Sequence, residues 1–283
     1  MTQNAHRLVS DQRASLAHTP SQSLEWLGHC LVPGAFSRFE IDRLKVAIDR
    51  VYRDYPGDSR DGRTSPENAE MFRYEMINRS EEVRQITSDR RVLDVIEPLL
   101  GCDCHLISST AWKNPAELDH APRGQEWHVD AGPFVPRPAG VPWPDEIPYP
   151  VFVIAVHVFL KDVTLDDGPT AVLEGSHRSG QRPPKAHEWN TGLEYDGRRC
   201  APMIAKAGDI GMFVSDAWHR RLPPRAGGTG RYFLQTNYAR RDIAQRIKPT
   251  AEVSHVRPDV VAMARTHRDR TVLGEHPQGL YDG

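Results

Sequence analysis

Cysteine is scarce in this sequence, which has only Cys30, Cys102, Cys104 and Cys200 among 283 residues. Four cysteines are too few for a disulfide framework, so we expect free thiols. Cys102 and Cys104 are separated by a single residue, which is compatible with half of a metal site. No second pair follows with the spacing of a structural zinc site, and this favours a structural role for both.

Long apolar runs and an excess of charge of one sign are also absent. No stretch is long enough to cross a bilayer, and residues 1–10 have no apolar run of the kind found in secretory signals. The formal net charge of −2 gives no electrostatic reason to expect nucleic acid or an anionic membrane as a partner. These absences predict a cytoplasmic protein without a nucleic-acid or membrane partner, and they leave its oligomeric state open.

The first third of the sequence indicates helices. Residues 1–23 are polar and aperiodic and are expected to form a flexible tail, with a single domain over 24–283. A short strand is expected at 27–32, followed by a helix capped by Ser37. A second helical region spans about 80–100 and is expected to end at Gly101 in a left-handed cap. Between the two helices, residues 60–68 are polar and predict a loop.

Beyond Gly101 the apolar period shortens towards two. Short segments rich in β-branched and aromatic residues are separated by Gly, Pro and Asp, which is typical of strands. These segments are 105–112, 151–160, 170–173, 202–206, 209–214 and 231–238. Helices followed by many short strands predict a mainly β fold with flanking helices, built on a double-stranded β-helix of the jelly-roll or cupin-like type.

Two long irregular segments interrupt the strands. Residues 132–150 contain seven prolines and Trp143, and residues 178–200 contain Trp189 and begin with Arg178. Proline stiffens a loop, and loops of this length in a compact domain are typical of lids or binding loops. Trp143, Trp189 and Arg178 are therefore candidates for contacting a substrate. The alternative is that each packs within its loop or lies on a solvated surface.

A metal site is indicated by the sequence Trp-His-Val-Asp at residues 127–130. In an extended strand, residues two apart point to the same face, so His128 and Asp130 can bind one metal ion. His219, much later in the chain, is well placed to be a third ligand. Two imidazoles and one carboxylate are the facial arrangement of non-haem Fe(II) oxygenases. A second His-x-Asp triplet at residues 267–269 has no strand to supply a third ligand and is interpreted as a solvated helix face.

The chain resembles the phytanoyl-CoA dioxygenase family of Fe(II)/2-oxoglutarate-dependent oxygenases. The resemblance covers roughly residues 25–240 and consists of short segments in the family's order. They are Leu-Val-Pro-Gly-Ala-Phe at 31–36, Trp-Lys-Asn-Pro at 112–115, Trp-His-Val-Asp at 127–130, Asp-Gly-Pro-Thr at 167–170, Gly-Ser-His-Arg at 175–178, Gly-Asp at 208–209, Trp-His-Arg at 218–220, and Arg231.

This resemblance implies that His128, Asp130 and His219 hold Fe(II), and that Arg231 binds the distal carboxylate of 2-oxoglutarate. A guanidinium suits that role because its planar fork makes two parallel bonds to a carboxylate. Lys113 matches a position that lines the cosubstrate pocket in relatives, the alternative being a surface lysine.

Two further residues are candidates for the same pocket. Thr170 also matches a position that lines it in relatives, although an ordinary strand threonine is the alternative. His157 lies in the apolar run 151–160 and is a candidate for facing the pocket; the alternative is a hydrogen-bonded core histidine.

The resemblance also implies a reaction. Fe(II), 2-oxoglutarate and O2 together would oxidise an unactivated C–H bond of a small molecule, by hydroxylation or oxidative ring closure. A natural-product or sugar-containing substrate is favoured. Relatives that halogenate carry a small residue in place of Asp130, so oxygen transfer is expected.

Where many relatives have a glycine after the distal histidine, this chain has Arg220 and Arg221, which leaves the contacts of that loop open. Two other functions remain possible from the sequence. One is a zinc or manganese hydrolase or isomerase with the same three ligands, and the other is a non-catalytic cupin-like binding module.

Overall fold

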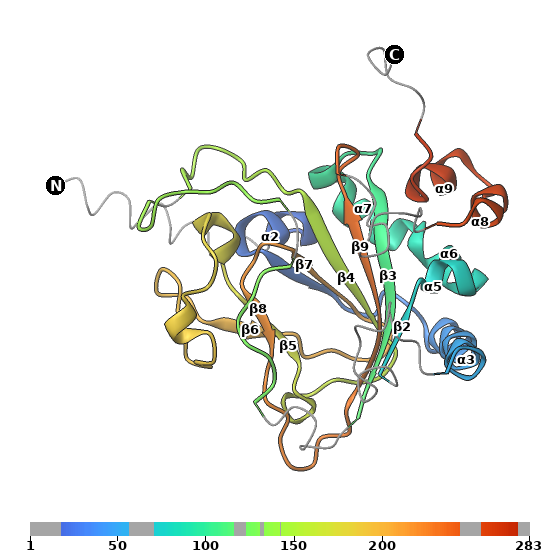
Figure 1. The fold of residues 1–283 in the computed structure, drawn as a ribbon, viewed down its shortest axis with the longest axis horizontal. Helices are drawn as coiled ribbons and strands as arrows, with labels where there is room; N and C mark the ends of the chain where they lie inside the picture. The colour runs from blue at the N-terminus through green and yellow to red at the C-terminus, as the bar shows by residue number, and fades with distance from the viewer. Residues whose placement is uncertain are drawn as a thin grey trace.

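Nine short strands form two antiparallel sheets in the parts of the chain that the structure, a computed structural model, describes: residues 18–56, 71–115, 123–130, 133–141, 143–243 and 256–276. The six-stranded sheet has the order β1 (His29–Val32), β7 (Ile210–Val214), β4 (Val153–Phe159), β9 (Arg231–Ala239), β3 (His105–Asn114), β2 (Phe72–Tyr74). The three-stranded sheet has the order β6 (Cys200–Pro202), β5 (Thr170–Leu173), β8 (His219–Arg221). Figure 1 shows the small sheet beside the large one.

The central strand β4 packs apolar side chains on both faces of the large sheet. On β4, Ala155 and Phe159 pack with Phe213 and with Val172 of the small sheet, whereas Val156 packs with residues of the helices. Successive side chains of a strand point to opposite faces, so an unbroken apolar run is what a strand covered on both sides requires. The space between the two sheets is therefore the interior in which a site can form.

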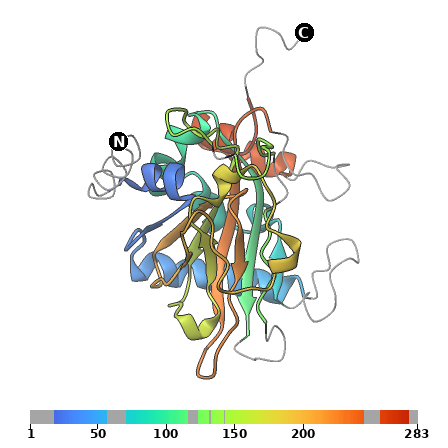
Figure 2. The same cartoon turned by 90° about the vertical axis from the view of Figure 1, so that its left-hand side faces the viewer.

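Helices cover the outer face of the large sheet (Figures 1 and 2). They are α2 (Pro20–Leu27), α3 (Arg38–Asp54), α5 (Met76–Arg79), α6 (Glu81–Thr87), α7 (Arg90–Leu100), α8 (Pro258–Ala262) and α9 (His267–Val272). None of the helices in the described ranges is long and apolar enough to cross a membrane. The arrangement is mainly β with flanking helices, as predicted.

Several predicted element boundaries were wrong. The expected tail through residue 23 is helical from Pro20, because Thr19 caps α2 in a capping box with Gln22. The helical region 80–100 is split at Asp89, whose carboxylate caps α7. Gly101 has a positive φ of 95°, but its ψ of 152° is extended, so it does not form the left-handed cap. The predicted loop at 60–68 lies outside the described residues.

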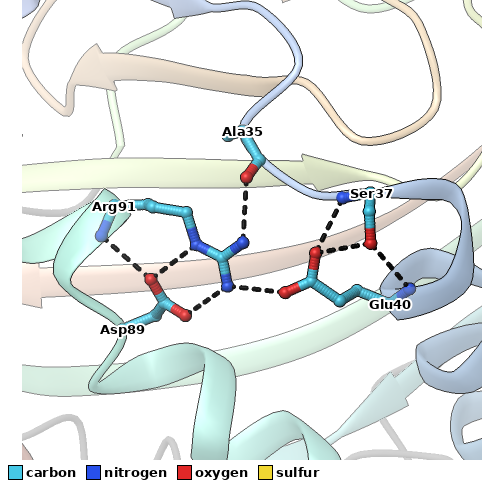
Figure 3. A network of polar contacts seen from close by, with 5 residues as sticks. All are labelled: Ala35, Ser37, Glu40, Asp89 and Arg91. Carbon is cyan, nitrogen blue, oxygen red and sulfur yellow. Dashed lines mark hydrogen bonds and ion pairs between the residues drawn. The ribbon is translucent and has the colours of Figure 1, made fainter.

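One arginine joins the starts of α3 and α7 (Figure 3). The guanidinium of Arg91 donates to the carboxylates of Asp89 at 2.6 and 2.8 Å and of Glu40 at 2.8 Å, and to the carbonyl of Ala35 at 3.0 Å. Glu40 in turn accepts from the backbone N–H of Ser37 at 2.7 Å, which closes the capping box of α3. This network fixes the starts of the two helices against the loop between β1 and α3.

Most predicted strands are present, with shifted ends. The segment predicted at 202–206 instead has a strand at Cys200–Pro202 and a single bridge between Val163 and Ala205. β2 and β8 were not predicted. β8 is only three residues long and contains two arginines, so its sequence resembles a polar turn, and only its pairing with β5 makes it a strand.

Candidate active site

Three side chains converge on one point between the sheets. Ligand atoms of His128, Asp130 and His219 all lie within 4.8 Å of one another. The imidazole rings are 4.3 Å apart between centroids, and Nε2 of His219 is 3.7 Å from a carboxylate oxygen of Asp130. Two imidazole nitrogens and one carboxylate oxygen are a donor set that suits Fe(II) and leaves coordination positions open.

Backbone pairing holds these three residues together. His128 and His219 form an antiparallel bridge in which each N–H donates to the other's carbonyl, at 3.0 and 2.9 Å. The N–H of Asp130 donates to the carbonyl of Ser215 at 2.9 Å. The segment that carries the His-x-Asp pair thus lies along β8, which brings ligands far apart in the sequence to one place.

Hydrogen bonds also select the tautomer of both histidines. Nδ1 of His128 is 2.8 Å from the carbonyl of Glu126, and Nδ1 of His219 is 2.9 Å from the carbonyl of Ala217. A carbonyl only accepts, so each Nδ1 carries the proton and each Nε2 keeps a lone pair for a metal. Burial lowers the pKa of His219 to about 4, against an opposing effect of Asp130. His219 is therefore a neutral imidazole, the form that binds metals.

Arg231 lies buried at the start of β9 without a carboxylate partner among the described residues. Its guanidinium donates to the amide oxygen of Asn114 at 2.8 and 3.1 Å and to the hydroxyl of Thr170 at 3.2 Å. Only 4% of the residue is exposed, and burial, followed by the positive charge of Arg221, lowers its pKa. A buried charge without a counterion is costly, so the arrangement fits an anionic ligand. Thr170 thus contacts Arg231, while its role in lining a cosubstrate pocket stays a prediction.

Lys113 does not line this pocket, and that prediction was wrong. Its ammonium lies 3.2 Å from the carboxylate of Asp49 on α3, and about half of its side chain is exposed. It pairs in register with Tyr232, whose side chain belongs to the helix-facing core. Because side chains alternate along β3, the next residue, Asn114, faces the interior instead. Asn114 was missed, although counting by two from Trp112 would have found it.

His157 faces the interior of the fold. The residue is 3% exposed, and neither ring nitrogen has a hydrogen-bond partner. Its ring lies 4.5 Å from that of Phe233 and 5.4 Å from that of Phe213. Burial, then the charge of Arg231 and then His219, lower its pKa to about 3, so the imidazole is neutral. The alternative of a hydrogen-bonded core histidine was wrong.

Other polar side chains on the same inner face were missed. Asn237 donates to the hydroxyl of Ser108 at 2.6 Å, and Gln235 donates to the amide oxygen of Asn237 at 3.5 Å. Gln235 pairs in register with His157, which places it on the same face. The signal was available in the sequence, since Arg231, Phe233, Gln235 and Asn237 follow one another at a spacing of two.

The proposed lid loops are irregular where they are described, and two of the three candidate side chains are engaged within them. Trp143 donates to the carbonyl of Ile147 at 2.6 Å. Arg178 donates to the carboxylate of Asp145 at 2.9 Å and lies 4.8 Å above the ring of Trp26. Trp143 and Arg178 thus hold the loop 143–150 in place.

Trp189 differs from them because it stays 44% exposed, at the edge of a stack with Arg220. Of the three predicted substrate contacts in the loops, it is the one whose ring is open to solvent.

A buried carboxylate anchors the first of these loops. The hydroxyl of Tyr149 donates to Asp216, which precedes the metal-site strand β8. Burial raises the pKa of Asp216 to about 7 from an ordinary value of 3.8, with the Tyr149 bond opposing that rise. Between about pH 4 and pH 7, Asp216 is therefore protonated in the folded protein and ionised in the unfolded chain.

Because only the folded state holds this proton, we expect the free energy of unfolding to fall as the pH rises towards 7. A carboxyl whose pKa is raised on folding contributes stability below its unfolded pKa, and that contribution is lost as the pH passes about 7. Asp216→Asn has no carboxyl to titrate and should lack this pH dependence. As the pH rises, the wild type should lose about 1 kcal/mol of unfolding free energy per pH unit relative to the variant. Urea unfolding in chelator at pH 5.5 and 8 measures it. Parallel changes in the two proteins would contradict this assignment.

Solved structures with the same fold are known. HygX from Streptomyces hygroscopicus, with nickel and 2-oxoglutarate bound, is 14% identical, covers 81% of this chain and 89% of its own, and has a TM-score of 0.60. The epimerase SnoN, in complex with Fe3+, α-ketoglutarate and nogalamycin RO, is 16% identical, covers 85% and 88%, and has a TM-score of 0.60. The carbocyclase SnoK from nogalamycin biosynthesis is 14% identical, covers 82% and 87%, and has a TM-score of 0.57. These likenesses confirm the predicted jelly-roll fold.

Sequence comparison identifies the family to which the chain belongs. No curated protein matches the chain. The model of the family described as phytanoyl-CoA dioxygenase (PhyH), whose enzymes depend on Fe(II) and 2-oxoglutarate and use O2, matches residues 25–225. A match over more than half of the chain sets aside the non-catalytic module and the zinc or manganese hydrolase. The chain therefore belongs to the phytanoyl-CoA dioxygenase family and is an Fe(II)- and 2-oxoglutarate-dependent dioxygenase.

Proposed function

We propose that His128, Asp130 and His219 hold the iron of this dioxygenase, and that Arg231 binds the distal carboxylate of 2-oxoglutarate. The observation that carries this proposal is the convergence of two sites on one interior. One is a His/His/Asp set in which each Nε2 keeps its lone pair, and the other is a buried guanidinium without a carboxylate partner in the described ranges. Asn114 and Thr170 orient that guanidinium.

Iron, 2-oxoglutarate and O2, when bound, supply the oxidising power to attack an unactivated C–H bond. The residues of the chain do little acid–base chemistry, because both histidine ligands have their Nδ1 protons engaged with backbone carbonyls. Their contribution is to hold the reactants in register and to exclude water. Asp130 keeps a carboxylate at the metal, which favours oxygen transfer over halogenation.

The substrate that we propose is a hydroxyl-rich or glycosylated natural product, oxidised by hydroxylation or ring closure. Ser108, Gln235 and Asn237 offer hydroxyl and amide groups on the inner face of the sheet, where a polar substrate can bond to them. The structural neighbours support this class, since HygX has been solved with hygromycin B and SnoN with nogalamycin RO. The loops at 132–150 and 178–200 would close over such a substrate, with Trp189 as a stacking surface.

The test is an anaerobic titration of the Fe(II)-loaded protein with 2-oxoglutarate, followed by the weak visible charge-transfer band of the chelate. We expect the band to appear and to saturate at one equivalent per iron. Aerobic addition of aminoglycosides and glycosylated polyketides would then be screened for substrate-dependent succinate release. Well-folded, iron-loaded protein that shows no band would contradict the proposed site.

A further inference from the structure

We propose that Arg221 is a second guanidinium for the distal carboxylate of 2-oxoglutarate, beside Arg231. This inference rests on the proposed function and adds a residue to it. The chain would then hold the cosubstrate between two arginines contributed by two different sheets. Arg221 lies just after His219, where this chain has two arginines and many relatives of the family have a glycine.

The strand register places Arg221 in the interior. Arg221 on β8 is the direct antiparallel partner of Thr170 on β5, and directly opposed residues project to the same face of a sheet. The hydroxyl of Thr170 accepts from Arg231 at 3.2 Å, so that face is the one that meets Arg231. His219, two residues before Arg221, faces the same interior.

The neighbouring Arg220 points the other way. Its guanidinium lies 5.5 Å from the ring of Trp127 and 6.0 Å from that of Trp189, and it donates to the carbonyl of Arg123 at 2.9 Å. Of the two adjacent arginines, only Arg221 shares a face with the candidate metal and cosubstrate residues.

In the part of the chain that the structure describes, no acidic side chain balances the charge of Arg221. The residue is 6% exposed, its Nε has no hydrogen-bond partner, and burial lowers its pKa with no acidic group among the described residues opposing that shift. Asp167 is the one carboxylate that counteracts the lowered pKa of Arg231, and both its oxygens already accept from Thr164 and Thr229 at 2.6–3.1 Å.

Arg221 and Arg231 are both buried, and Arg221 is close enough to lower the pKa of Arg231. Among the described residues no free carboxylate pairs with either guanidinium, which favours an anionic ligand. A carboxylate has about four lone-pair sites, enough to accept from two arginine forks at once. Figures 1 and 2 show that a connection at the lower end of the molecule joins β8 and β9. Arg221 is the last residue of β8 and Arg231 the first of β9.

The backbone around Arg221 restricts where its guanidinium can go. A Cβ atom at Gly168, where φ is +66°, would lie 3.3 Å from Nε of Arg221 and 2.6 Å from the carbonyl of Leu222. Glycine at this position lets the loop pack directly against the arginine. A guanidinium confined in this way is already oriented before the ligand arrives, which lowers the entropy lost on binding.

The experiment compares two ligands in the Fe(II)-loaded protein without oxygen. One is 2-oxoglutarate, and the other is 2-oxopentanoate, which has a methyl group in place of the distal carboxylate. Binding is followed by the charge-transfer band and, independently, by the ligand-induced rise in melting temperature. Arg221→Met is compared with wild type and with Lys113→Met, which removes one positive charge from the opposite face of the large sheet.

We expect Arg221→Met to weaken 2-oxoglutarate by roughly 10- to 100-fold, the loss that follows from one charge-assisted contact. Its binding of 2-oxopentanoate should stay within about twofold of wild type, since that ligand has no distal carboxylate. Lys113→Met should bind both ligands within about twofold of wild type, because it keeps both arginines. The ligand-free Arg221→Met protein should melt at a higher temperature than wild type, because an unpaired buried charge has been removed. Arg221→Lys keeps the charge without the fork and should fall between the two.

Unchanged 2-oxoglutarate binding in Arg221→Met would overturn the inference, and so would an equal loss of both ligands, which would assign Arg221 a structural role. Failure of the proposed function is a different outcome, because wild type itself would then show no band with 2-oxoglutarate.

Discussion

His219→Ala is expected to abolish iron binding while leaving the fold intact. His219 supplies one of three ligands, and loss of a residue that merely orients a ligand already costs roughly 10- to 100-fold in metal affinity, so loss of the ligand itself should exceed about 100-fold. Succinate formation should fall to background. Equilibrium dialysis against Fe(II) measures the affinity, and circular dichroism with thermal melting measures the fold.

The chain contains a matched control for this variant. His267 belongs to the second His-x-Asp triplet, and the structure places it, exposed, at the first residue of α9, as the sequence predicted for a helix face. His267→Ala should bind iron as wild type does. If His219→Ala retained wild-type affinity, the three-residue site would have to be abandoned. If both variants lost affinity, the effect would not be specific to the convergence seen here.

Arg231→Met is expected to remove 2-oxoglutarate binding without removing iron. The guanidinium is fully desolvated and held by Asn114 and Thr170, so a carboxylate bound to it would form a buried ion pair. Breaking such a pair costs about 3–5 kcal/mol, which corresponds to roughly a 150- to 4000-fold rise in the dissociation constant. The anaerobic charge-transfer titration gives that constant, and the same dialysis gives the iron affinity.

Arg231→Lys is the informative companion. It keeps a positive charge but cannot make two parallel bonds from a planar fork, so its affinity for 2-oxoglutarate should lie between those of wild type and Arg231→Met. A dissociation constant in Arg231→Met equal to that of wild type would show that the cosubstrate carboxylate binds elsewhere. Loss of iron together with 2-oxoglutarate would instead mean that Arg231 supports the metal site.

Much of what was predicted about the strands and the metal site followed from the spacing of residues close together in the sequence. Residues two apart in an extended chain point to the same side, and the structure places the ligand atoms of His128 and Asp130 close together. The strand 170–173 was predicted with its observed bounds, because a short β-branched run between turn residues has few other conformations. The ordered motifs of the family, rather than any single residue, pointed to His219 and Arg231.

The side-chain positions that were mispredicted or left open have a common physical cause. Lys113 and Asn114 are neighbours on one strand, and which of them faces the interior depends on the register of β3 against β9. Arg221 looks like part of a polar turn until β5 pairs with β8 and sets its face. Trp143 and Arg178 look like free loop residues until Ile147 and Asp145 are seen to bond them.

By itself, the sequence determined the family, the helices before strands, and the three residue types that can bind iron, because these depend on composition, short-range spacing and motif order. Only the tertiary structure decided which polar side chains share the interior. Pairing between distant strands sets the faces of β3, β5, β8 and β9, and with them the position of Asn114, His157 and Arg221 around the candidate cosubstrate site. Strand pairing is long-range, and a shift of one residue reverses every face, so spacing along the chain does not encode it.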